Sequence, residues 1–293
     1  MIISSQGEAC SPNDDIKALD LNGTKALRER LRQIQANSDS GEAALLAEAE
    51  IDLEQEKQAD KVELTKVEQA RQALQDFRDY LAQCSDKAAQ ALPSEEELVY
   101  NYNPDTQECE ITRQGGRVFE LDLNSSNLQG ELPLPPQLMV TRLLCQGNEL
   151  TDLTGLPTSL TTLICYRNQL TTLPKLPASL AQLYCEHNQL TKLPELPDNL
   201  TELYCEGNQL TTLPVLPDNL TKLYCGRNKL TSLPILPANL SEIYCRNNQL
   251  TTLPELPDSL FKLDCRDNRT LAEKPATKRT LKALIDRGGV VVS

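Results

Sequence analysis

The sequence contains no tryptophan, three phenylalanines and one histidine, so several kinds of site can be excluded at once. The single histidine, His187, rules out sites built from several imidazoles, and no Ser-His-Asp or Cys-His set can be assembled around it. We expect His187 to be a solvated loop residue. No glycine-rich phosphate-binding loop and no cluster of metal ligands occurs in the sequence. The sequence therefore predicts a protein that is not an enzyme and that uses no cofactor or metal.

Basic residues are too few to balance the acidic ones, and long apolar runs are missing. The net charge of −13 argues against nucleic acid or an anionic membrane as the main partner. No stretch approaches the roughly 18 apolar residues of a membrane span. The first residues, MIISSQGEACSPNDD, lack the basic start and apolar core of a secretory signal peptide. We therefore expect no membrane association, and a disordered N-terminus over residues 1–13.

Ten cysteines are present, but their spacing is not that of a disulfide framework. Seven of them recur at intervals of 20 residues: Cys145, Cys165, Cys185, Cys205, Cys225, Cys245 and Cys265. Such a ladder places thiols along a line, whereas a metal site needs ligands that converge on a point. We expect reduced thiols that fill a core, and hence a reducing, cytoplasmic compartment.

Residues 14–93 have the pattern of long helices. A helix of about 50 residues is expected from an N-cap at Asp39, with Glu42 completing a capping box. Its apolar residues follow the 3-4 spacing typical of a seam between two helices: Val67, Ala70, Leu74, Phe77, Leu81, Cys84 and Ala88. An earlier helix over residues 14–36, joined by the turn NSDSG, would complete an antiparallel helical hairpin, or a coiled coil with another chain.

Residues 94–120 change to two β-rich runs around the turn NPDT, with a second turn at Gly115 and Gly116. This pattern predicts a small β-rich N-terminal cap.

Residues 121–270 are built from a 20-residue repeat, L-x-x-L-x-C-x-x-N-x-L-T-x-L-P-x-L-P-x-x. Seven units carry the asparagine, and a degenerate unit, LDLNSSNL, precedes them. This is the signature of a leucine-rich repeat, whose units bury their leucines only by stacking side by side. In TELYCEG, alternation predicts a short strand with Leu203 and Cys205 inward and Tyr204 outward. The asparagines are expected to bond backbone groups of their own and the neighbouring turn, and the paired prolines exclude a helix on the return path.

Residues 271–293 read as a C-terminal cap with a closing amphipathic helix. Thr277 is expected as its N-cap, and Gly288-Gly289 as its end. The expected apolar face consists of Leu281, Leu284 and Ile285. The predicted fold class is therefore α+β: an N-terminal helical hairpin or coiled coil, then a leucine-rich-repeat solenoid with a parallel β-sheet, closed by a capping helix.

The stretch LPELPDNLTELYCEGNQLTTLP resembles the short bacterial leucine-rich repeats of the YopM/IpaH effector family, which carry L-P-x-L-P-x-x-L-x-x-L-x-x-x-x-N-x-L. The resemblance covers residues 121–270 and implies a horseshoe that binds host proteins after injection by a pathogen. Three features depart from the family pattern. The region before the repeats is strand-rich, the cysteine is regular where the family commonly has Val or Ala, and 23 residues after Thr270 leave no room for the family's ubiquitin-ligase domain.

The outward positions of the predicted strands form a candidate binding face. Between the inward Leu and Cys, an apolar or aromatic stripe runs along the solenoid: Leu144, Ile164, Tyr184, Tyr204, Tyr224 and Tyr244. The column after the cysteine is acidic in one part and basic in another; its residues expected to contact a partner are Tyr166, Glu186, Glu206, Arg246 and Arg266. Arg227, one residue beyond the column, is also expected to contact the partner, and Arg167 lies at the equivalent place. An exposed aromatic stripe beside a polarised column can bind and orient a protein partner.

Part of this face also has a structural interpretation. Stacked tyrosines also stabilise neighbouring strands, so the stripe is either a binding face or a passive ladder. The column before the stripe, Glu202, Lys222, Glu242 and Lys262, alternates in sign and is expected to pair across strands within the protein.

These observations predict a non-enzymatic scaffold that binds a partner protein on the concave face of the repeats. The resemblance extends this to an effector that reaches a host cytosol without a signal peptide. One alternative is a relative of the family's ubiquitin ligases that lacks the catalytic domain. The family's Cys-x-Asp motif occurs at Cys84-Ser85-Asp86 and Cys265-Arg266-Asp267, but we expect both cysteines to be core residues. Another alternative is a structural assembly protein, with a homo-oligomer formed through the N-terminal helices.

Overall fold

The computed structural model describes residues 42–116, 119–268, 271 and 275–292. The chain divides into two compact units. One contains the described residues up to Gln72 together with Val99–Glu110, and the other contains Ala73–Leu98 with Ile111–Ser293. The predicted first helix over residues 14–36 and the capping box at Asp39 lie outside the described residues. Among the described helices, none combines the length and apolar character needed to cross a membrane.

Helix α2 (Glu42–Cys84) contains the predicted apolar seam as far as Cys84, and the short helix α3 (Asp86–Ala89), which follows it, contains Ala88. Leu74, Phe77 and Leu81 are at most 1% exposed. They belong to the same unit as the repeats, where the Tyr80 hydroxyl donates to the Gln129 carbonyl at 3.4 Å. The sequence assigned this part of the seam to a helix pair, and the predicted partner helix lies outside the described residues, so the pair stays a prediction. In the structure, this stretch of α2 lies beside the first coils of the solenoid. The open end of a repeat stack exposes core side chains, and an element in this place can cover them.

Strands β1 (Leu98–Asn103) and β2 (Glu108–Arg113) form a two-stranded sheet, preceded by the 3₁₀ turn η1 (Glu95–Glu97). The Asn103 side chain accepts from the Asp105 N–H at 2.9 Å and so fixes the predicted NPDT turn. Gly115 and Gly116 have φ angles of 80° and 68°, a left-handed conformation that glycine adopts without strain.

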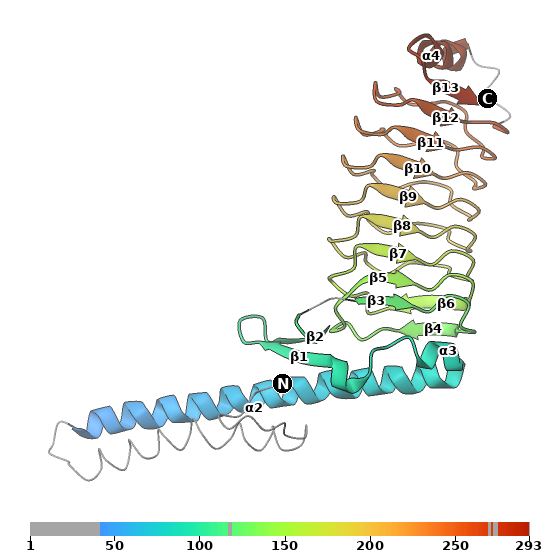
Figure 1. Ribbon diagram of the computed structural model, residues 1–293. Coiled ribbons are helices and arrows are strands. Elements are labelled where there is room, and N and C mark those ends of the chain that lie inside the picture. Colours follow the sequence, from blue (N-terminus) through green and yellow to red (C-terminus); the bar gives the residue numbers. More distant parts are fainter. Residues whose placement is uncertain (1–41, 117–118, 269–270, 272–274, 293) are drawn as a thin grey trace. The chain divides into compact units, whose positions relative to one another are not determined.

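The repeats stack into a nine-stranded parallel sheet in the order β13-β12-β11-β10-β9-β8-β7-β5-β3 (Figure 1). The strands are β3 (Phe119–Asp122), β5 (Val140–Leu144), β7 (Thr162–Ile164), β8 (Gln182–Tyr184), β9 (Glu202–Tyr204), β10 (Lys222–Tyr224), β11 (Glu242–Tyr244), β12 (Lys262–Asp264) and β13 (Val290–Val292). Equivalent residues of successive coils face each other, as with Tyr204, Tyr224 and Tyr244. A second parallel pair, β4 (Gln129–Pro133) and β6 (Glu149–Thr154), forms a small sheet in the first coils.

The core lies inside the coils, as the repeat predicts. Leu203 and Cys205 are fully buried, and all nine described cysteines are free thiols. The Asn188 amide donates to the carbonyls of Cys165 and Cys185, both at 3.1 Å, while its oxygen accepts from the Leu170 N–H at 3.0 Å. Each asparagine therefore joins two adjacent coils through buried backbone groups, which confirms the predicted ladder.

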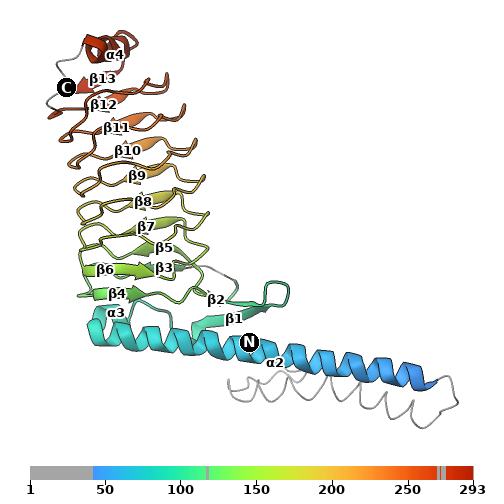
Figure 2. The same ribbon diagram turned by 180° about the vertical axis from the view of Figure 1, so that it is seen from behind.

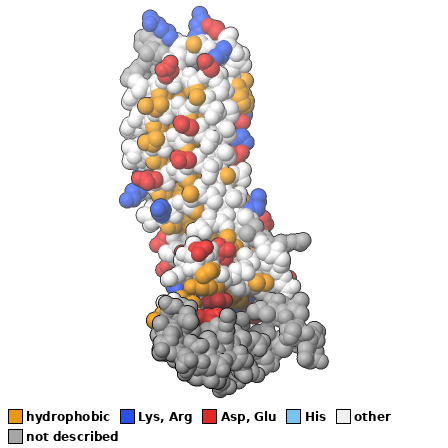
Figure 3. Space-filling model, turned by 90° about the vertical axis from the view of Figure 1, so that its left-hand side faces the viewer, with side chains coloured by type: hydrophobic (Ala, Val, Ile, Leu, Met, Phe, Trp, Pro, Cys, Tyr) orange, Lys and Arg blue, Asp and Glu red, His pale blue; other side chains and the backbone are white. Residues whose placement is uncertain are grey.

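The return segments between β7 and β12 contain no helix or strand (Figure 2). Their paired prolines account for this, because proline cannot donate a hydrogen bond and disfavours helix. Val215 and Ile235, each placed between the two prolines of its repeat, are 87% and 90% exposed. On the face shown in Figure 3, hydrophobic side chains form bands along the stack, with acidic side chains among them.

The C-terminal cap contains helix α4 (Pro275–Asp286) and strand β13. The helix begins at Pro275, so Thr277 lies within it and the prediction of Thr277 as N-cap was wrong. Proline suits the first helical position, because its missing N–H is not needed there. Leu284 is buried, but Ile285 is 55% exposed and is not part of the buried face. The helix ends at Asp286, and Gly288, with a φ angle of 88°, turns the chain away from it, in agreement with the predicted end at Gly288-Gly289. Strand β13 then joins the sheet beside β12, which the sequence analysis did not predict.

Candidate partner-binding site

The tyrosine stripe is a stack of aromatic rings on the outer sheet face, the face of the parallel sheet opposite the buried Leu and Cys side chains. Ring centroids of Tyr184, Tyr204, Tyr224 and Tyr244 are separated by 4.5, 4.4 and 4.2 Å, with interplanar angles of 11°, 26° and 17°. All four side chains are half-buried. The ring faces contact one another, so a partner can meet only ring edges and hydroxyl groups.

Polar groups beside this stack are satisfied within the protein. The Tyr184 hydroxyl donates to Glu202 at 2.9 Å, and the pKa of Tyr184 is raised, first by burial and then by this bond. Glu202 also accepts from Lys222 at 3.0 Å, which confirms the predicted cross-strand pairing at this point. Farther along, the Lys262 ammonium lies 5.0 Å from the centre of the Tyr244 ring. These contacts favour the ladder explanation for the stripe.

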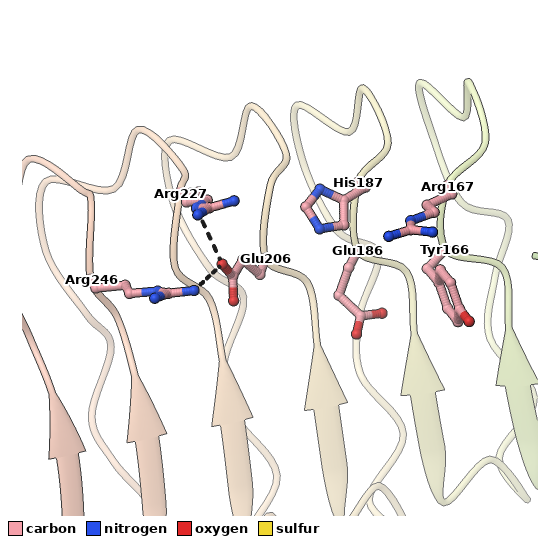
Figure 4. Close-up of a pocket in the computed structure, with 7 residues that line it drawn as sticks. All are labelled: Tyr166, Arg167, Glu186, His187, Glu206, Arg227 and Arg246. Carbon is pink, nitrogen blue, oxygen red and sulfur yellow. Dashed lines mark hydrogen bonds and ion pairs between the residues drawn. The ribbon is translucent and has the colours of Figure 1, made fainter. Parts of the chain in front are cut away.

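In the column that follows the cysteines, some charged side chains are paired within the protein and others are not. Glu206 forms ion pairs with Arg246 at 3.0 Å and with Arg227 at 3.5 Å (Figure 4). Arg246 reaches Glu206 across the intervening coil, where the column holds Gly226. A Cβ atom at Gly226 would lie 3.2 Å from both Cγ and the carbonyl oxygen of Arg246. The missing side chain therefore gives the arginine its path.

Glu186, one coil away from Glu206, forms no such ion pair within the part of the chain that the structure describes. Its Oε2 atom is buried without a hydrogen-bond partner among the described residues. Burial is the main cause that raises the pKa of Glu186 to about 7, and the charge of Glu206 adds to it. Gln146 Oε1 and Arg246 Nε, in the same column, are also buried without partners there. Buried polar atoms without partners are rare in folded proteins and cost free energy.

A hollow of about 340 Å³ lies at this column, lined by Tyr166, Arg167, Glu186, His187, Glu206, Arg227 and Arg246. Figure 4 shows these side chains arising where the chain leaves successive strands. Arg167, His187 and Arg227 occupy equivalent turn positions with φ angles of 54°, 53° and 50°. The coil between His187 and Arg227 has Gly207 at this position, and a Cβ there would lie 2.6 Å from His187 Nδ1. The glycine thus leaves the imidazole the space that it occupies.

The structure brings together five of the residues predicted to contact a partner: Tyr166, Glu186, Glu206, Arg227 and Arg246. The four stripe tyrosines do not line the hollow, and neither do Leu144, which is 9% exposed, and Ile164, which is half-buried. Arg266 instead pairs with Asp264 at 2.8 Å. Sequence reasoning did not assign Arg167 and His187 to the site, although their shared position in the repeat was a usable signal.

The cysteines of the two Cys-x-Asp motifs differ in their burial. Cys265 is 4% exposed, and burial raises its pKa to about 11, which disfavours the reactive thiolate. Cys84 ends helix α2 and is only half-buried, so the prediction that it is a core residue was wrong. Within the described part of the chain, no group of three or more His, Cys, Asp or Glu side chains could hold a metal ion.

The stacked parallel strands, buried leucines and asparagine ladder define this chain as a leucine-rich-repeat solenoid with an N-terminal helix. No family model and no curated protein matches the chain. Among solved structures, YopM from Yersinia enterocolitica is 40% identical, covering 50% of this chain and 34% of that chain, with a TM-score of 0.45. YopM from Yersinia pestis, described as a leucine-rich effector protein, is also 40% identical, covering 51% and 43%, with a TM-score of 0.47.

A Shigella effector leucine-rich-repeat domain is 33% identical, covering 53% of this chain and 76% of that domain, with a TM-score of 0.44. The repeat region is therefore similar to the leucine-rich repeats of YopM/IpaH-type bacterial effectors. This chain spans less than half the length of the two YopM chains.

Proposed function

We propose that this protein is a non-enzymatic scaffold that binds a partner protein on the outer sheet face of its repeats, the face predicted to be concave. The observation that carries this proposal is the hollow beside the tyrosine stack. Glu202 and the ladder asparagines, which lie elsewhere on the sheet, find partners inside the protein. In the hollow, Glu186 retains a buried oxygen without one. Such groups support a surface that a partner completes.

The similarity to YopM and to the Shigella effector domain extends the proposal to a secreted bacterial effector that acts on host proteins. The free thiols of the repeats fit a reducing host cytosol, where disulfides are rare. Repeat solenoids commonly present an extended face to protein partners. The effector role rests on this similarity, and the choice of face rests on the residues of the hollow.

Site-specific photocross-linking tests the choice of face. A photoreactive amino acid would replace exposed Arg167 at the hollow or, as a matched control, Val215 in a return segment, which is 87% exposed. Each full-length protein would be irradiated in a cytosolic extract of animal cells, and adducts would be identified by mass spectrometry. We expect a defined adduct from position 167 that unlabelled wild-type protein competes away, and none from position 215. Equal adducts from both positions, or none from position 167, would contradict the proposal.

A further inference from the structure

The charged groups of the hollow are sorted by depth. Arg167 and His187 are exposed, and the Arg227 side chain is 54% exposed. The carboxylates lie beneath: the Glu206 side chain is 17% exposed, and the Oε2 atom of Glu186 is buried. A group that approaches from solvent therefore meets the basic side chains first.

The basic side chains are also the ones that can form further hydrogen bonds and ion pairs. Among the described residues, the side chains of Arg167 and His187 make no hydrogen bond or ion pair. Arg227 touches Glu206 only through a 3.5 Å contact from Nε, while Arg246 holds the same carboxylate oxygen at 3.0 Å. Two guanidinium groups and an imidazole thus line one rim, and Figure 4 shows the guanidinium groups of Arg167 and Arg227 reaching toward His187 from opposite sides.

The carboxylates do not cancel this rim. Glu206 is already paired with Arg246 at 3.0 Å, so its charge is balanced without Arg227. Burial raises the pKa of Glu186 to about 7, so near neutral pH part of its population is uncharged. Arginine is the side chain best suited to carboxylates, because its planar fork can donate two parallel hydrogen bonds.

We propose that the rim formed by Arg167, His187 and Arg227 binds an acidic side chain, the carboxylate of an Asp or Glu, of the partner protein. This inference rests on the proposed function and names the chemistry that the same site selects. A carboxylate at the rim accepts from the two guanidinium groups and from an N–H of the His187 imidazole. Gly207 has no side chain, which gives the His187 imidazole its place in the row next to Arg227.

Peptide selection tests the inference without a known partner. A phage-displayed library of random peptides would be panned against the full-length wild-type protein, with counter-selection on an Arg167→Gln/Arg227→Gln variant. The control variant Lys192→Gln removes one positive charge from an exposed lysine outside the hollow, and so matches the single variant Arg167→Gln. Thermal unfolding would confirm that all variants are folded.

We expect the retained peptides to share an Asp or Glu at one position. Replacing that acid by its amide should weaken binding to wild type about tenfold, the scale of a charge-assisted contact at a partly exposed site. Arg167→Gln should weaken binding of the acidic peptide similarly, whereas Lys192→Gln should leave it unchanged. Retained peptides that share Lys or Arg, or an amide replacement without effect, would overturn this inference but leave the proposed function standing. Failure of the cross-linking at position 167 would overturn the proposed function itself.

Discussion

Replacing Asn208 by alanine should measure how strongly the asparagine ladder holds adjacent coils together. Asn208 is 8% exposed and makes three buried bonds. Its amide donates to the carbonyls of Cys185 and Cys205 at 3.0 and 3.1 Å, and its oxygen accepts from the Leu190 N–H at 3.1 Å. The two carbonyls keep a second donor each, from the asparagines at 188 and 228. The Leu190 N–H would lose the partner that the structure gives it.

The expected loss in the free energy of unfolding is about 3 kcal/mol. An orphaned buried donor costs roughly 1–3 kcal/mol, and each lost neutral hydrogen bond contributes about 1 kcal/mol. Asn208→Asp should cost at least as much at pH 7, because it replaces the donating amide by a carboxylate facing two carbonyl oxygens. The control Gln189→Ala, at an exposed neighbouring repeat position, should change stability by less than about 0.5 kcal/mol.

Urea unfolding followed by circular dichroism would give these differences, with the slope compared between variants. Repeat stacks unfold by coupling between neighbouring coils, so the midpoint should fall without loss of the folded baseline. If Asn208→Ala and Gln189→Ala were equally stable, the ladder would not be what ties the coils together, and the reasoning would fail.

Three further predictions follow from the ring stack, the hollow and the thiols. Tyr204→Ser should lower the free energy of unfolding by about 2 kcal/mol, because two stacked ring pairs are lost at roughly 0.5–1.5 kcal/mol each. Tyr204→Phe keeps both pairs and serves as the control. Equal losses of stability for the two variants in urea unfolding would contradict the ladder. The folded-state pKa of Glu186, about 7, lies above its unfolded value of about 4.3, so the folded protein binds the extra proton between these values and stability falls as pH rises through this window. Glu186→Gln should therefore reduce the loss of stability between pH 5 and pH 8, and an unchanged pH dependence would refute this. Burial raises the pKa of Cys145 to about 12, which disfavours its reactive thiolate. Iodoacetamide at pH 8 should therefore label half-buried Cys84 well before Cys145 in the folded protein, as measured by mass spectrometry. Equal labelling rates would contradict the buried ladder of thiols.

Features set by the repeat period could be predicted from the sequence. One 20-residue alternation fixes which side of every strand faces the core, so Leu203 and Cys205 could be placed inside and Tyr204 outside. The asparagine bonds follow for the same reason, because every coil presents the same orphan groups to the next. Because every coil repeats the same contacts, the pattern of one repeat predicts the structure of the whole stack.

Features that depend on breaks in the period were harder to predict. The reach of Arg246 to Glu206 depends on Gly226 having no side chain, a contact between alternate coils that no single repeat specifies. The outward placement of the tyrosines could be predicted, but ring planes packed against each other at about 4.4 Å could not. Strand β13 has no repeat signature, because three valines serve equally in many settings. The sequence also could not decide what the buried side chains of Leu74, Phe77 and Leu81 pack against, because a 3-4 seam fits a helix pair and a solenoid end alike.

The central claim, that a partner binds at the hollow on the outer sheet face, is tested most directly by a hydrogen-exchange footprint of the complex. The partner would be the protein identified by cross-linking, added in excess to the full-length chain. We predict slower exchange in the segments 164–167, 184–187 and 204–207, with the return segment 213–217 unchanged. Protection confined to the return segments, with residues 164–207 exchanging as in the free protein, would contradict the account.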